Sequence, residues 1–171
     1  MTLLLERTTE QQQEAARTAA LKRYNANRHT PDRPGWSYGK CPKSEYRAIV
    51  AEIGAAIFLG SNWEELCLYS SNPADYMGAD IGDWEIKAGS TFTKKDMTKG
   101  KYILWVNPWE EKEEYVCDYE TCRRGTHHKL TGYVEILGWT HLAEDEYKDC
   151  GGYYRPVALR SAALLVKELA A

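Results

Sequence analysis

The sequence lacks any apolar run long enough to cross a membrane. Its 171 residues hold only short apolar stretches, whereas a membrane-spanning helix needs about 20 such residues in succession. The first residues, MTLLLERTTEQQQ, also lack the basic start and the extended apolar core of a secretory signal. These absences predict a cytoplasmic protein with no membrane partner.

The cysteine count and the missing nucleotide-binding motifs argue against two classes of protein, namely disulfide-stabilised proteins and nucleotide hydrolases. The five cysteines are an odd number, and without an export signal they favour free thiols over a disulfide framework. The sequence also contains neither a GxGxxG pattern nor a P-loop, which disfavours nucleotide hydrolysis.

The charge is uninformative in total but strongly segregated along the chain. The net charge of −3 is unlike that of a typical nucleic-acid-binding domain. Residues 17–47, however, carry eight Lys and Arg against two acids, and residues 87–101 carry five Lys and one Asp. Between them, residues 48–86 carry seven acids and no Lys or Arg. A metal site flanked by polyanion-binding surface produces this pattern, and so do ordinary solvated faces.

Hydrophobic spacing and turn residues predict a mixed α/β or α+β domain. We expect residues 1–42 to form an N-terminal helix and a basic arm, and 43–171 to form a single domain. The expected elements are helices at 9–24, 44–59 and 161–170, a tight hairpin at 79–90, and strands at 101–108, 132–142 and 153–160.

Three charged residues of the expected hairpin have spacing suited to phosphodiester chemistry. Glu85 and Lys87 are two residues apart, so on a strand they point to the same side. Asp80 would approach Glu85 from the adjoining strand. Two converging carboxylates repel one another unless a cation neutralises them, and hard divalent cations prefer such oxygen ligands. A metal ion beside a lysine can activate water and stabilise developing charge on a phosphate.

The run Ala79-Asp80-Ile81-Gly82-Asp83-Trp84-Glu85-Ile86-Lys87 resembles the PD-(D/E)XK signature of the restriction-endonuclease-like nucleases, in particular small phage-encoded members. Glu52, on the helix expected before the hairpin, matches the glutamate that often completes that site. The spacing of Asp80 and Glu85 is short for the family, no proline precedes Asp80, and Asp83 is an alternative first acid. The resemblance covers roughly residues 43–160 and implies an α/β (α+β) fold with a restriction-endonuclease-like core, in which a central mixed β-sheet is flanked by helices.

The resemblance implies a metal-dependent DNA nuclease with Glu52, Asp80, Glu85 and Lys87 as catalytic residues. Asp80, Glu85 and the backbone carbonyl of Ile86 would bind Mg²⁺ or Mn²⁺, and Glu52 would hold a ligand water or a second ion. Lys87 would orient the attacking water. A chain of this size would need two copies to cut both strands, which favours a homodimer. The resemblance also implies a phage- or mobile-element-encoded protein that acts in the host cytoplasm.

Basic residues near this segment are the expected DNA contacts, because they would meet phosphates. They are Lys94, Lys95, Lys99, Lys101, Arg123 and Arg124.

Two other interpretations remain open at this point. The first is a catalytically inactive protein of the same fold that binds DNA or a protein partner. The second is a zinc-stabilised interaction module, because Cys117, Cys122, His127 and His128 have roughly zinc-ligand spacing. The pattern matches no standard zinc knuckle, and cysteine in a β-rich chain is more often a small core residue, so we do not expect zinc.

Overall fold

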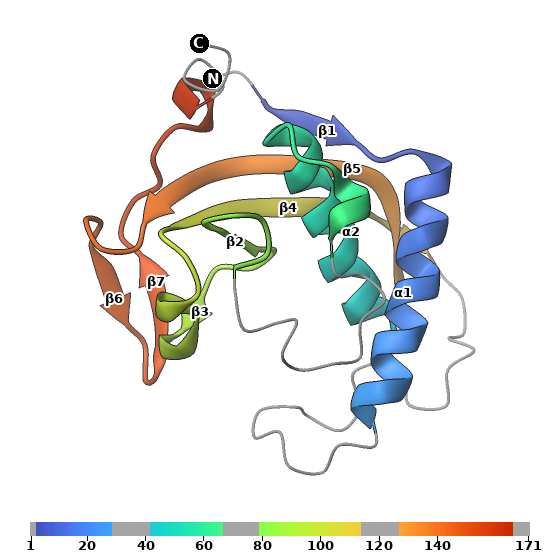
Figure 1. The fold of residues 1–171 in the computed structure, drawn as a ribbon, viewed down its shortest axis with the longest axis horizontal. Coiled ribbons are helices and arrows are strands. Elements are labelled where there is room, and N and C mark those ends of the chain that lie inside the picture. Colours follow the sequence, from blue (N-terminus) through green and yellow to red (C-terminus); the bar gives the residue numbers. More distant parts are fainter. Residues whose placement is uncertain (1–2, 29–41, 67–78, 114–126, 166–171) are drawn as a thin grey trace.

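The computed structural model of the chain describes residues 3–28, 42–66, 79–113 and 127–165. It has an α+β fold built on a mixed sheet, as the sequence predicts (Figure 1). In chain order the elements are β1 (Leu5–Arg7), α1 (Glu10–Arg28), α2 (Pro42–Phe58), the 3₁₀ helix η1 (Trp63–Glu65), β2 (Trp84–Lys87), β3 (Phe92–Thr93), the 3₁₀ helix η3 (Lys94–Thr98), β4 (Tyr102–Glu113), β5 (His127–His141), β6 (Tyr147–Asp149) and β7 (Tyr153–Pro156).

The main sheet has the strand order β1-β5-β4-β2. Strand β5 is antiparallel to both β1 and β4, whereas β2 is parallel to β4, with Glu85 opposite Ile103. A parallel neighbour requires a crossover connection, and the chain makes it through β3 and η3. The crossover therefore returns residues 92–98 to the vicinity of β2.

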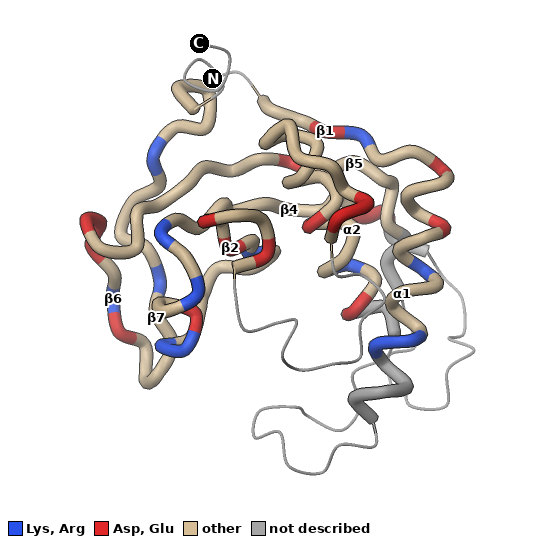
Figure 2. Tube along the Cα trace, viewed as in Figure 1, with Lys and Arg blue, Asp and Glu red and all other residues tan. Residues whose placement is uncertain are grey.

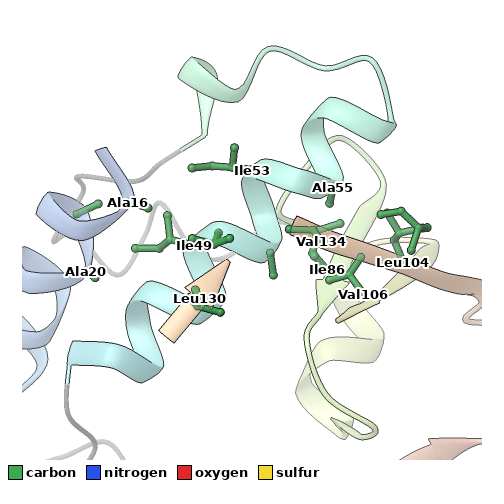
Figure 3. Packing of buried hydrophobic residues seen from close by; sticks show 14 of the residues in the cluster. Ala16, Ala20, Ile49, Ile53, Ala55, Ile86, Leu104, Val106, Leu130 and Val134 are labelled. Atoms are coloured by element: carbon green, nitrogen blue, oxygen red, sulfur yellow. The ribbon is translucent and has the colours of Figure 1, made fainter. Parts of the chain in front are cut away.

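Helix α2 covers one face of the main sheet. Its buried residues Ile49 and Ile53 belong to the same core as Ile86 of β2 and Val134 of β5, and Figure 3 shows them packed together. Gly54 lets the helix approach β5 closely, because a Cβ atom at this position would lie 2.6 Å from the Cβ of Val134. The packing of α2 thus fixes the height of its other residues above β2 and β4.

The N-terminal segment also belongs to this core. The helix expected at 9–24 is confirmed as α1, and its alanines Ala16, Ala19 and Ala20 are buried against α2 (Figure 3). Strand β1, which the sequence did not suggest, pairs with β5. Strand β1 and helix α1 of the N-terminal segment therefore pack against the rest of the described fold, and residues 29–41, where most of the basic arm is expected, lie outside the described ranges.

A second, three-stranded sheet has the order β3-β7-β6 and packs around its own apolar cluster of Phe92, Ile103, Trp105 and Leu142. The ring centroids of Phe92 and Trp105 lie 6.1 Å apart. Because Ile103 and Trp105 belong to β4, this cluster joins the small sheet to the main one. None of the helices in the described ranges has the length and apolar character needed to cross a membrane.

Candidate functional site

The tight turn expected at Gly82–Asp83 is confirmed, but the hairpin expected over 79–90 is wrong, because Asp80 lies outside any strand and β2 pairs with β4 instead. The backbone N–H of Ile81 donates to the carbonyl of Trp84, and that of Trp84 donates back to Ile81, at 3.0 and 2.8 Å. Gly82 has a φ of 56°, in the left-handed region where glycine has no Cβ penalty. Strand β2 begins at the end of this turn, and Asp80 is the residue immediately before the turn.

The side chains of β2 alternate between an apolar side and a charged side. Ile86 is buried in the main core, with Trp84 and Ala88 packed against the same cluster. Glu85 and Lys87 face the other way, as two residues at a spacing of two on a strand must. Glu85 is nevertheless only 3% exposed, so this side of the strand is enclosed and is not a solvated surface.

On the charged side, two lysines and two acids form a closed set of ion pairs. The Nζ atom of Lys87 lies 3.2 Å from Oε1 of Glu85 and 3.0 Å from Oδ2 of Asp96. The Nζ atom of Lys99 lies 3.8 Å from the same Glu85 oxygen and 3.5 Å from Oδ1 of Asp96. Each ammonium group therefore meets both carboxylates.

Asp96 is held in place by the start of η3. Its Oδ2 atom accepts hydrogen bonds from the backbone N–H and the hydroxyl of Thr93, at 2.9 and 3.1 Å. Burial opposes ionisation of Asp96, but the charges of Lys87 and Lys99 and the hydrogen bond from the N–H of Thr93 together outweigh it, and the pKa of Asp96 is lowered. The same cap that begins the helical turn thus presents a carboxylate to Lys87.

Asp80 is tied to β2 by its backbone. Its Oδ2 atom accepts a hydrogen bond of 2.8 Å from the N–H of Ile86. Part of the residue is exposed to solvent, yet the surrounding protein crowds the carboxyl group, and this burial raises the pKa of Asp80. The Asp80 carboxylate therefore sits beside the strand position that carries Glu85.

Glu52 reaches the same region from α2. Its Oε2 atom lies 3.6 Å from Nη2 of Arg23 on α1, and the side chain is only 17% exposed. Burial, followed by the charge of Asp80, raises the pKa of Glu52 to about 7, although Arg23 favours its ionised form. The helix glutamate is thus a partly neutralised acid in an enclosed setting.

The three predicted acids act on one another electrostatically. Burial and the charge of Asp80 raise the pKa of Glu85 to about 7, and Glu85 in turn contributes to the raised pKa of Glu52. The Oε2 atom of Glu85 is buried and has no hydrogen-bond partner among the described residues. An uncompensated buried carboxylate oxygen is costly, and a cation is one means of satisfying it.

The chemistry of these side chains suits a hard divalent cation, but their positions do not form a finished metal site. Within the described ranges, no three His, Cys, Asp or Glu side chains are gathered closely enough to hold one ion. The three acids influence one another electrostatically, and Asp80 and Glu85 also interact with Lys87 and Lys99, whereas Glu52 pairs with Arg23. The potential metal ligands Asp80, Glu85 and Glu52, with the carbonyl of Ile86, are therefore neighbours without being a coordination shell.

The residues expected to contact DNA fall into three groups. Lys94 and Lys95 are exposed on η3, and Lys101 is exposed beside Asp83, with a distance of 3.5 Å between Nζ and Oδ2. Lys99 instead points into the acidic cluster. Arg123 and Arg124 lie outside the described residues.

The four candidate zinc ligands cannot be placed within the described part of the chain. Cys117 and Cys122 lie outside the described residues, and the side chains of His127 and His128 are not described.

Sequence reasoning missed two participants, Asp96 and Arg23. Asp96 follows Thr93 by three residues, which is the spacing of a capping box, so a search for helix starts in the Lys-rich block would have found it. Arg23 carried no comparable signal, because its approach to Glu52 depends on how α1 packs across α2.

No family model matches the chain, and no curated protein or solved structure matches it either.

Proposed function

We propose that this chain is a metal-dependent nuclease that hydrolyses DNA phosphodiester bonds, built on a restriction-endonuclease-like core. The single observation that carries the proposal is the mutually interacting set of Glu52, Asp80 and Glu85 beside Lys87, in which the carboxyl group of Glu85 is buried. Its members come from a helix, a bend before a turn and a strand, in the chain order that the resemblance to the PD-(D/E)XK signature implies, although Asp80 lies outside any strand.

The metal is part of the proposal. Asp80, Glu85 and the backbone carbonyl of Ile86 would hold Mg²⁺ or Mn²⁺, and Glu52 would hold a water ligand or a second ion. When bound, such an ion supplies Lewis acidity and lowers the pKa of a bound water. The raised pKa values of Glu52 and Glu85 fit this role, because a cation would relieve the repulsion that contributes to them.

The chain's own residues perform the remaining tasks. Lys87 is charged, since Glu85 and Asp96 raise its pKa against the effect of burial. An ammonium fixed between two carboxylates can donate a hydrogen bond to the attacking water or to a phosphate oxygen without reorienting during the reaction. Asp96 keeps Lys87 in position, and the Asp80 contact with the N–H of Ile86 keeps the turn against β2.

The test is cleavage of plasmid and linear DNA by purified protein in Mg²⁺ or Mn²⁺, with EDTA as the metal-free arm. We expect metal-dependent cleavage by the wild type, and a loss of at least about a hundredfold in Glu85→Gln and Lys87→Ala, the scale of a removed electrostatic group. Glu64→Gln and Lys22→Gln are matched controls, because both residues are exposed. Circular dichroism and melting curves establish that each variant is folded.

One observation favours a second candidate, a catalytically inactive protein of the same architecture that binds DNA or a protein partner. Lys87 and Lys99 already neutralise Glu85 and Asp96, so this part of the cluster is electrically balanced without a metal ion. Such a protein would bind its partner equally well in EDTA and in Mg²⁺ and would cut no DNA. Absence of cleavage by the folded wild type in both metals refutes the nuclease proposal.

A further inference from the structure

The outer face of the β3-β7-β6 sheet carries two cations that form no ion pair with the described residues. Lys148 on β6 and Arg155 on β7 are direct cross-strand partners, and both are exposed. Like charges placed directly opposite one another destabilise an antiparallel pair. Neither side chain has an ion-pair partner among the described residues, so an external anion is the group that would relieve their repulsion.

Neither of the acids nearest in sequence forms an ion pair with Lys148 or Arg155. The carboxylate of Asp149 accepts hydrogen bonds from the N–H groups of Gly151 and Gly152, at 3.0 and 3.2 Å. Asp149 is also opposite Tyr154, which places it on the other side of the pleat from Lys148. Glu146 lies on the same side as Lys148 but is exposed and leaves both cations without a direct partner.

An aromatic ring lies on the same face as the two cations. Tyr153 is two residues from Arg155 on β7, so both point outward, and Tyr153 is 54% exposed. The residue between them, Tyr154, points inward and brings its ring to within 5.6 Å of Phe92. Two cations beside an exposed aromatic ring are the combination that binds single-stranded nucleic acids, because phosphates meet the charges and bases stack on the ring.

This face leads to the candidate site through η3. Thr93 of β3 is the cross-strand partner of Tyr153, and its backbone is capped by Asp96, which contacts Lys87. The exposed Lys94 and Lys95 follow Thr93 directly. In Figure 2 the Lys and Arg segments of β6 and β7 lie on the same side of the molecule, at the left of the view.

We infer that the outer face of β6 and β7 binds the sugar–phosphate backbone of a nucleic acid. Lys148 and Arg155 contact neighbouring phosphates, and an unpaired base stacks on Tyr153. The inference rests on the proposed function for where the bound strand leads, which is along η3 to the acidic cluster. The binding itself requires neither a metal ion nor cleavage.

Fluorescence anisotropy with labelled single-stranded and duplex DNA, in EDTA and over a range of salt concentrations, tests the inference. The variant K148Q/R155Q is compared with R7Q/K22Q, which removes the same charge from exposed positions on β1 and α1. We expect K148Q/R155Q to bind single strands at least about tenfold more weakly, with the slope of log affinity against log salt reduced by about 1.4, the value for two phosphate contacts. R7Q/K22Q should retain the wild-type affinity and slope.

The stacking is tested separately with Y153L. We expect this variant to bind single strands at least about fivefold more weakly while duplex binding is unchanged. Unchanged single-strand binding overturns the role of Tyr153. The melting temperature of K148Q/R155Q should not fall below that of the wild type, because the substitution removes a like-charge pair.

The remaining outcomes separate this inference from the proposed function. An equal loss of DNA affinity in the two double variants, or a wild type that binds no DNA, overturns the inference that the outer face of β6 and β7 binds nucleic acid. A wild type that binds in EDTA yet never cuts with Mg²⁺ or Mn²⁺ refutes the nuclease proposal and leaves the face supported. A wild type that cuts, while K148Q/R155Q binds normally, refutes the face alone.

Discussion

The two sides of β2 differ in what surrounds them, although they alternate along only four residues. On one side, Ile86 joins an apolar core beneath α2 (Figure 3). On the other, Glu85 and Lys87 are enclosed with Asp96 and Lys99. Burial stabilises the first side through the hydrophobic effect, whereas on the second side the same burial raises the pKa of Glu85. A single strand thus combines a stabilising face with one where charges are held at a cost.

The largest expected effect comes from breaking the apolar side. Ile86→Ala should lower the free energy of unfolding by about 2–4 kcal/mol, because it removes buried methyl groups and leaves a cavity under α2. Leu137→Ala is the control, since Leu137 is 45% exposed on β5 and its truncation should cost less than about 0.5 kcal/mol. Urea unfolding measures both. Equal losses would show that β2 is not part of the cooperative core.

The charged side should show itself as a dependence of stability on pH. Without metal, Glu52 and Glu85 have pKa values of about 7 against an ordinary value of 4.5. The folded state therefore favours the protonated forms of these two carboxyl groups over the ionised forms. Stability is therefore greatest below the ordinary pKa and is lost as the pH rises through that window to about 7.

This loss is measured by urea unfolding in EDTA at about pH 5 and about pH 7.5. Across that interval the wild type should lose roughly 2 kcal/mol more stability than Glu52→Gln/Glu85→Gln, whose amides do not titrate. Parallel pH profiles for the two proteins would contradict the prediction.

The smallest of the three effects separates capping from charge at Asp96. Asp96→Ala removes the acceptor for both Thr93 hydrogen bonds and should cost about 1 kcal/mol. Asp96→Asn keeps an acceptor oxygen while losing the charge, so it should cost less. Thermal melts of the two variants measure the difference. If asparagine is as damaging as alanine, the ion pairs with the lysines are more important to stability than the cap.

The sequence predicted those features that depend on local spacing. The turn at Gly82–Asp83, the alternation of Ile86 with Glu85, and the two long helices follow from glycine placement and hydrophobic period. The main exception is β1, whose three residues form a strand because β5 offers an edge. A segment that short has no periodicity of its own to detect.

The candidate site was predictable only in part, for a related reason. The sequence places Glu85 and Lys87 on one side of a strand, but the enclosure of Glu85 depends on the crossover that returns η3 to β2. The approach of Arg23 to Glu52 depends on the packing of α1 on α2. Tertiary contacts determine whether the acids interact, and local sequence patterns do not predict such contacts.

The position of β1 has a consequence for biosynthesis. Leu5 pairs with Glu135, so β1 meets its partner only after every residue between these two positions has been synthesised. Contacts between residues this remote in sequence are slow to form. The main sheet should therefore be completed as one unit once β5 is available, rather than progressively from β1.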